Sequence, residues 1–465
     1  MLSKKYPARL LLAEALAAAT LLAACGGGTA DGNGTVQTAD QPAAEAPATS
    51  GDAPAPSSVV APPSVLAATR ESAQATTCPA PDHATPRVAA WDMTRDTGAE
   101  RQALLARFAL AVVNMPLDAA RTTAFVDGVR AISPTTAIAQ YLPFPDLRNN
   151  AVSTDYSYAL AAAVEANGWW LRKADGSLAS FTSGSTWAVN MTGWAAPNAD
   201  GQRYPQFKAA YDYRMFFQST PVDYAFTANT FARPRVDADW RGDGTDQSRT
   251  DPTIQAAMRA GYAAYWAELR ALEPSVKIMG GLDNSNDLSS PEFKDQLDGA
   301  FLDGMIGKSW SLESQAGWDA AMERYRAAMA NTRAAKDVLF VTYGQSPTDY
   351  ATLRYGLASA LMDDGMFLFI PSTGSQAPAW YDEYAAPLGA AVDAPPLAPA
   401  QNGVYLRRFE NGLVLVNPSK TLTASINVGA GYKRLSGAQD PTVNNGRAES
   451  TVTLGPRQGL LMIKQ

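Results

Sequence analysis

Histidine and cysteine are almost absent from this chain of 465 residues. The single histidine is His83 and the two cysteines are Cys25 and Cys78, so all three precede the long region that begins near Arg87. A Ser-His-Asp triad needs an imidazole, a thiol nucleophile needs a cysteine, and a zinc site usually needs one or the other. Any acid–base chemistry in the long region must therefore use carboxylates, tyrosine or lysine.

Positive charge is also scarce. The chain has 38 Lys and Arg against 45 Asp and Glu, a formal net charge of −7, and no run of basic residues. An acidic surface without a basic patch argues against nucleic acid as a partner. Beyond the first residues, no segment offers the roughly 20 apolar residues that a membrane-spanning helix needs.

Residues 1–25 have the pattern of a secretory signal peptide. A positively charged start and an apolar run over 10–22 precede Ala23-Ala24-Cys25-Gly26. Small residues before a cysteine resemble the lipobox of bacterial lipoproteins, which implies lipidation of Cys25 and a membrane partner reached through that lipid. Gly26 after the cysteine implies the outer membrane of a Gram-negative cell envelope. A plain secretory peptide cleaved nearby is the alternative.

Residues 26–86 consist mainly of Ala, Pro, Gly, Ser and Thr. Such a stretch buries too little apolar surface to offset the entropy lost on ordering. We predict a disordered tether between the lipid and a folded domain. Cys78 lies in this tether as either a free or an intermolecular thiol.

Short apolar runs alternate with helical patterns across 87–390. The clearest helix is expected from Asp251 to Leu272, with Asp251 as N-cap and Pro252 at the first helical position. Eight strands alternating with helices predict an α/β fold, a (β/α)8 TIM barrel, although a doubly wound sheet would give a similar string. The segment 143–220 would be an insertion after the third strand. The predicted strands are 88–92, 110–113, 136–141, 222–228, 276–281, 299–303, 337–342 and 366–370.

The pattern changes to antiparallel strands in 391–465. A segment rich in Pro and Ala over 391–400 is followed by two alternating runs joined at Asn411-Gly412, which is a strong hairpin signal. We predict a small C-terminal antiparallel β domain, sandwich-like in character.

Functional groups of such barrels lie just beyond the carboxyl ends of the strands. These positions hold acids, amides and a tyrosine, which suits glycoside cleavage, since one acid protonates the leaving oxygen and a second carboxylate attacks or activates water. Aromatic faces stack on sugar rings. The alternative is that these acids cap the following helices. The residues at these positions are Asp92, Asn114, Gln140, Asn229, Asp283, Asp303, Tyr343 and Ser372.

We expect Asp303 to be the general acid, because it ends an apolar strand that would hold it in a cleft. Its partner carboxylate is expected to be Asp283, on the adjacent strand, with Asp92 or Glu313 as alternatives. A polysaccharide is the expected partner. The side chains expected to bind it are Trp91, Gln140, Asn190, Asn229, Trp310 and Tyr343.

Several segments resemble the glycosyl hydrolases of TIM-barrel type, especially the group known as hypothetical glycosyl hydrolase family fifteen. They are Val88–Asp92, Asp223–Asn229, Asp298–Asp303 and Tyr405–Pro418. The resemblance implies a glycoside hydrolase barrel followed by a β domain.

One departure from that pattern keeps other functions open. Related barrels tend to read Asp-Gly-x-Phe-x-Asp-Asn at the second segment, whereas Ala228 precedes Asn229 here. A degenerate barrel that binds polysaccharide without cleaving it is therefore the alternative function. A polysaccharide deacetylase or lyase is a third class, although the usual metal-dependent deacetylase wants histidine ligands.

The polar loop 237–251 is a candidate calcium site. From Asp239 it resembles the start of an EF-type calcium loop, with acids at positions one and five (Asp239 and Asp243) and glycine at position six. Position three is Arg241, and position twelve is not Glu. Calcium is one expectation for this loop, and a solvated turn leading into the 251–272 helix is the other.

Overall fold

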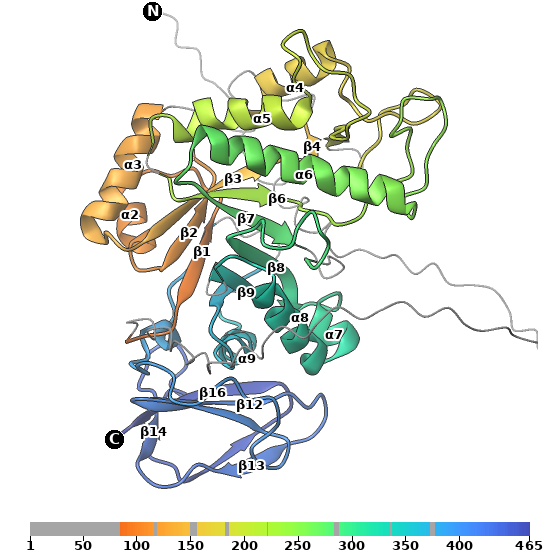
Figure 1. The fold of residues 1–465 in the computed structure, drawn as a ribbon. Helices are drawn as coiled ribbons and strands as arrows, with labels where there is room; N and C mark the ends of the chain where they lie inside the picture. The colour runs from red at the N-terminus through yellow and green to blue at the C-terminus, as the bar shows by residue number, and fades with distance from the viewer. Residues whose placement is uncertain are drawn as a thin grey trace, which may run out of the picture. The chain divides into compact units, whose positions relative to one another are not determined.

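The computed structural model describes residues 84–115, 119–148, 156–181, 186–220, 222–282, 288–334, 337–372 and 377–465. Eight parallel strands close into a barrel in the order β1-β10-β9-β8-β7-β6-β3-β2 (Figure 1). The predicted α/β barrel is thereby confirmed, and the doubly wound sheet is excluded because the sheet closes. The strands are β1 (Val88–Asp92), β2 (Leu110–Val113), β3 (Ala137–Pro143), β6 (Tyr224–Ala228), β7 (Lys277–Leu282), β8 (Gly299–Ile306), β9 (Val338–Tyr343) and β10 (Met366–Ile370).

Side chains alternate between two apolar layers along each strand, as the period of two requires. The inward set fills the barrel and includes Trp91, Phe226 and Phe301. The outward set, which includes Ala90 and Ala300, packs against the surrounding helices. The parity of a residue within its strand therefore decides whether its side chain can reach the barrel interior.

The helices around the barrel follow the strands in the order that the sequence predicts. The longest, α6, begins at Pro252, where Asp251 caps it by accepting a hydrogen bond from the backbone N–H of Thr253 at 2.8 Å. The helices are α2 (Ala99–Leu105), α3 (Ala119–Ile132), α6 (Pro252–Leu272), α7 (Leu312–Ala316), α8 (Trp318–Ala330) and α9 (Tyr350–Ala360).

The segment between β3 and β6 forms its own small layer. It contains β4 (Asp146–Leu147), α4 (Tyr156–Ala166), β5 (Trp187–Ala188), α5 (Tyr204–Asp212) and a π-helical turn (Tyr213–Phe217). Helix α5 lies along α6 (Figure 1). Between these two helices Lys208 and Asp212 form a fully buried ion pair.

The chain after the barrel forms antiparallel sheets. One has the order β11-β12-β16-β14, and β13 pairs with β15. The predicted hairpin is present, because β11 and β12 pair up to Phe409 and Gly412 on either side of the turn. The strands are β11 (Tyr405–Phe409), β12 (Gly412–Asn417), β13 (Ala424–Asn427), β14 (Tyr432–Arg434), β15 (Thr451–Leu454) and β16 (Gln458–Lys464).

Ion pairs of Arg354 join α9 to the chain that follows the barrel. Arg354 of α9 bonds Glu383 at 3.0 Å and Asp440 at 2.6 Å. Strand β16 also lies very close to α9, since a side-chain carbon at Gly459 would lie 2.4 Å from the carbonyl oxygen of Arg354.

Candidate active site

Asp303 lies inside the barrel, where a β-bulge begins in β8. Asp303 shares the inward parity of Phe301, and its side chain is only 6% exposed. The register between β8 and β9 then shifts, because Leu302 pairs with Phe340 whereas Ile306 pairs with Thr342. Gly304 adopts a positive φ of 63° within this bulge. Bulges of this kind redirect side chains next to active sites.

Tyr343 and Trp310 complete the surroundings of Asp303. The hydroxyl of Tyr343, at the end of β9, donates a hydrogen bond of 2.7 Å to Oδ1 of Asp303. The half-buried indole of Trp310 meets the Tyr343 ring edge-on at 5.4 Å. Trp310 also covers Gly304, where an added Cβ would lie 2.0 Å from the indole. The bulge therefore requires glycine for two reasons, its backbone angle and its contact with Trp310.

An aromatic cluster lies below these residues. Trp91 contacts Tyr141, Phe226 and Phe301 at ring-centroid distances of 5.7, 5.8 and 5.3 Å. Tyr141 stacks on Phe226 and is half-buried. Among the described residues, Trp91 Nε1 is a buried donor without a hydrogen-bond partner. Tyr141 was not among the predicted site residues. It lies two residues after Ala139, which faces inward, so the alternation of the strand indicates that Tyr141 faces inward as well.

Asp92 and Gln140 face away from this interior. Asp92 shares the outward parity of Ala90, and Arg101 of α2 donates to both of its oxygens at 2.6 and 2.5 Å. Gln140 lies within β3, because the strand continues to Pro143 rather than ending at 141 as predicted. Its amide oxygen accepts from the Met115 N–H, and its amide nitrogen Nε2 donates to the Tyr141 carbonyl. The structure does not bring either side chain together with Asp303.

Asn229 directly follows β6 and bonds an acid, Asp146, that was not predicted from the sequence. Its φ is +53°, and its Nδ2 donates to Oδ1 of Asp146 at 3.2 Å. Asp146 is buried and also accepts from Thr186 at 2.6 Å. Burial raises the pKa of Asp146 above its ordinary value, although the two hydrogen bonds oppose this shift. Nothing in the local sequence marks Asp146, since its burial depends on the distant β5.

Ala228 occupies the last inward position of β6. It belongs to the cluster that fills the barrel and is buried. An acid at this position would face the interior on the wall of the barrel that also carries Phe226. The departure noted in the sequence therefore falls on an inward-facing position at the carboxyl end of the barrel.

Two further predicted residues lie elsewhere. Asn190, after β5, donates to the carbonyl of Trp240 at 2.9 Å and accepts from the Thr192 hydroxyl at 2.7 Å. Glu313 lies on α7, where it is 1% exposed and receives Arg457 from the C-terminal region at 3.0 Å. Glu313 thus links the barrel to the C-terminal sheets.

The two acids of the calcium candidate bond to their own loop. Asp239 accepts from the backbone N–H groups of Asp243 and Gly244 at 2.9 and 2.8 Å. Asp243 accepts from Thr245 N–H and from the Gln247 amide, each at 3.0 Å. Within the described ranges, no group of three or more His, Cys, Asp or Glu side chains is arranged to hold a metal ion. Asp283 and Cys25 lie outside the described residues.

Solved structures that resemble this chain include barrel glycosidases. Amy13B of Eubacterium rectale is 10% identical, with 82% of this chain and 94% of that chain covered and a TM-score of 0.44. A GH27 β-L-arabinopyranosidase from Geobacillus stearothermophilus is 9% identical, with 82% and 96% covered and a TM-score of 0.45. The glycoside hydrolase domain of PelA from Pseudomonas aeruginosa is 14% identical, with 63% and 98% covered and a TM-score of 0.38. No curated protein matches this sequence.

The sequence profile of one family covers most of the barrel. The closed (β/α)8 barrel with a buried inward carboxylate among aromatic side chains is compatible with glycoside hydrolysis. The match spans residues 130–413, more than half of the chain. The chain belongs to hypothetical glycosyl hydrolase family 15.

Proposed function

We propose that this protein hydrolyses glycosidic bonds of a polysaccharide, with Asp303 as the reacting carboxylate. The observation that carries the proposal is the position of Asp303, whose buried side chain faces the inside of the barrel beside a bulge and is bonded by Tyr343. The neighbouring aromatic rings offer faces on which sugars stack. Trp91 Nε1, a buried donor, would find a partner in a sugar hydroxyl.

Tyr343 orients Asp303 for this role. The Tyr343 phenol donates to Oδ1 of Asp303 and so fixes the direction of this carboxyl group inside the barrel. As general acid, Asp303 would give a proton to the leaving oxygen and then recover it from water. The second carboxylate is proposed to be Asp283, which follows the adjacent strand β7. Asp92 and Glu313 are less suited, because each already pairs with an arginine.

The alternative is a barrel that binds polysaccharide without cleaving it. The observation that favours it is Ala228, which fills an inward position where an acid would face the site. Under this alternative the aromatic cluster would still bind sugars, and Asp303 would accept hydrogen bonds from hydroxyl groups. The two functions differ in whether the glycan is shortened.

An experiment in H₂¹⁸O separates these functions. The purified protein is incubated with soluble polysaccharides, and the products are analysed by mass spectrometry. Hydrolysis predicts shorter glycans with one ¹⁸O at each new reducing end, and Asp303→Ala should abolish them. A lyase would give unsaturated ends without ¹⁸O, and a deacetylase would release acetate from an unshortened chain. Binding without any shortening would select the non-catalytic barrel.

We further propose that a lipid on Cys25 anchors the protein to the outer membrane, with residues 26–86 as a tether. The sequence before Cys25 supports this proposal. None of the helices in the described ranges is long and apolar enough to span a bilayer. Cys25→Ser should abolish labelling by a fatty-acid probe and release the protein from membranes, whereas the matched Cys78→Ser control should keep both. Membrane attachment of Cys25→Ser would reject the anchor.

A further inference from the structure

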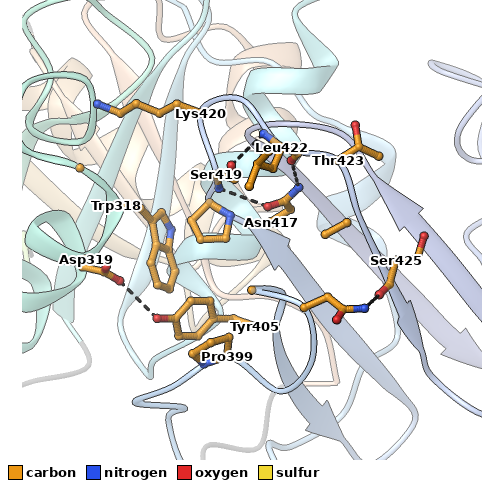
Figure 2. A pocket seen from close by; sticks show the side chains of 15 residues that line it. Trp318, Asp319, Pro399, Tyr405, Asn417, Ser419, Lys420, Leu422, Thr423 and Ser425 are labelled. Atoms are coloured by element: carbon orange, nitrogen blue, oxygen red, sulfur yellow. Dashed lines mark hydrogen bonds between the residues drawn. The ribbon is translucent and has the colours of Figure 1, made fainter.

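A cavity lies outside the barrel, between the start of α8 and the C-terminal sheets. Its volume is about 710 Å³. Helix α8 and its N-cap contribute Gly317, Trp318 and Asp319. The C-terminal region contributes the other lining residues, which include Pro399, Asn402, Tyr405 and Pro418 (Figure 2). A cavity of this size falls within the range of small-molecule binding sites. None of its lining residues belongs to the site around Asp303.

Flat rings form part of the wall. Trp318 packs on Tyr405 with ring centroids 4.5 Å apart, and Figure 2 shows the Tyr405 ring between Trp318 and Pro399. Trp318 is itself buried and held by a 2.8 Å hydrogen bond from Nε1 to Ser359. The ring wall is thus fixed before any ligand binds. Rings of this kind provide apolar contact with the C–H faces of a sugar.

Polar groups of the cavity keep hydrogen-bonding capacity. Asp319 is exposed, and its Oδ1 accepts a 3.3 Å bond from the Tyr405 hydroxyl. Its Oδ2 has no protein donor in the described structure. Asn402 donates from Nδ2 to the Ser425 carbonyl at 2.8 Å, which leaves its amide oxygen as an acceptor. Burial and the Asp319 carboxylate raise the pKa of Tyr405, so its hydroxyl stays protonated as a donor.

The charges of the cavity argue against an anionic ligand. Its cation, Lys420, donates to the Ser314 carbonyl at 3.0 Å, and Asp319 supplies a negative charge of opposite sign. Phosphate recognition by side chains needs converging cations, whereas the lining has one lysine and a carboxylate. Acceptors and hydroxyl groups beside flat apolar rings suit a neutral molecule rich in hydroxyl groups.

The cavity is also fixed relative to the barrel. Lys420 and Arg457 of the C-terminal region bond Ser314 and Glu313 of α7. Helices α7 and α8 follow β8, so the α8 start lies at the barrel edge where the strands end, the edge that carries Asp303. A polymer that enters the barrel at this edge has a second rigid surface within the same molecule.

We propose that this cavity is a second glycan-binding site, which holds a neutral oligosaccharide segment of a polymer. The inference rests on the proposed polysaccharide hydrolysis for its ligand class, and the cavity supplies the geometry. The site raises the local concentration of polymer near the barrel, as linked binding sites do. It therefore affects long substrates and leaves short ones unchanged.

The test removes the two acceptors and keeps the ring residues Trp318, Tyr405 and Pro399. The double variant Asp319→Ala/Asn402→Gly removes both, and glycine suits Asn402 because its φ is +50°. The matched control is Glu323→Ala, which removes an exposed acid from the same helix outside the cavity. Binding is measured by electrophoresis through native gels that contain soluble starch, galactomannan or arabinan. Hydrolysis is measured on each polymer and on its trisaccharide.

We expect at least one gel to retard the wild type and the Glu323→Ala control, and to retard the double variant much less. The KM for that polymer should rise about tenfold in the double variant, as expected for two lost hydrogen bonds, with the trisaccharide rate unchanged. Equal retardation and equal KM would overturn the second site while leaving hydrolysis intact. Failure of all three gels to retard the wild type would also overturn it. Retardation lost in the double variant, without hydrolysis by the wild type, would support the site and reject the proposed hydrolysis.

Discussion

The buried charge between α5 and α6 offers a quantitative test of how the insertion is held. Asp212 accepts hydrogen bonds from Lys208, Tyr156 and Tyr265, the last at 2.6 Å. Lys208 and Asp212 are both fully buried. Asp212→Ala therefore leaves an ammonium group and two phenols without their acceptor. Breaking such a pair from one side typically costs about 3–5 kcal/mol of unfolding free energy.

Proton release by Lys208 sets an upper limit to this cost. Burial lowers the pKa of Lys208 from its ordinary 10.5, and Asp212 opposes that shift. Once Asp212 is gone, Lys208 can instead lose its proton in the folded state. At pH 7 this costs about 5 kcal/mol, since each pKa unit corresponds to about 1.36 kcal/mol, and at pH 9 it costs about 2 kcal/mol. The destabilisation should therefore shrink by up to about 3 kcal/mol between pH 7 and pH 9.

Urea unfolding at both pH values measures this change. The compensating double variant Lys208→Met/Asp212→Leu removes both charges, and such apolar replacements are often neutral or stabilising. It should recover the part of the loss that comes from the unpaired ammonium group, whereas the phenols of Tyr156 and Tyr265 still lack their acceptor. A loss below 1 kcal/mol for Asp212→Ala at pH 7, or a loss that does not shrink at pH 9, would refute the reasoning.

Three further predictions concern Asp146, the bulge and the tether. The pKa of Asp146 is raised in the folded state, so its contribution to the free energy of unfolding falls as the pH rises from the ordinary pKa of 3.8 through the raised pKa. Asp146→Asn should flatten that fall in urea titrations from pH 4 to pH 7. Parallel wild-type and variant profiles would exclude this contribution of Asp146. Gly304→Ala should lower the free energy of unfolding by about 1–3 kcal/mol because of its backbone angle, and further because Trp310 must move, and it should slow any glycan cleavage. The control Gly168→Ala, at φ +65° with no neighbour within 4 Å, should lower the free energy of unfolding less and leave the cleavage rate unchanged. Limited proteolysis should cut within 26–86 and leave a compact fragment that starts near Arg87, and unfolding of that fragment would show that the tether packs on the domain.

The strand order of the barrel was predictable from sequence, because each strand is a short apolar run and helices separate the runs. The hairpin at Asn411-Gly412 was equally predictable from its turn residues. Strand ends were less predictable. The third strand extends two residues beyond the predicted end, which places Gln140 inside it, and β8 continues to Ile306 through a bulge. Bulges depend on pairing with another strand, which local sequence does not record.

The orientation of the candidate acids shows a second limit. Asp92 and Asp303 both follow apolar runs, yet a difference of one residue in parity sends Asp92 outward to Arg101 and Asp303 inward to Tyr343. Glu313 pairs with an arginine 144 residues away, a contact that only the tertiary fold determines. Tyr141 could have been found by following the alternation of β3, whereas the burial of Asp146 depends on Thr186 from a distant loop.

The rate of glycan cleavage by Asp303→Asn tests the central claim most directly. Asparagine keeps the shape of the side chain and its bond from Tyr343 but cannot act as an acid. With the exposed Asp175→Asn as control, and with unchanged circular dichroism and unfolding midpoint, the rate on the cleaved polysaccharide should fall at least about 100-fold in Asp303→Asn alone. Turnover equal to that of the wild type would show that Asp303 is not the reacting carboxylate.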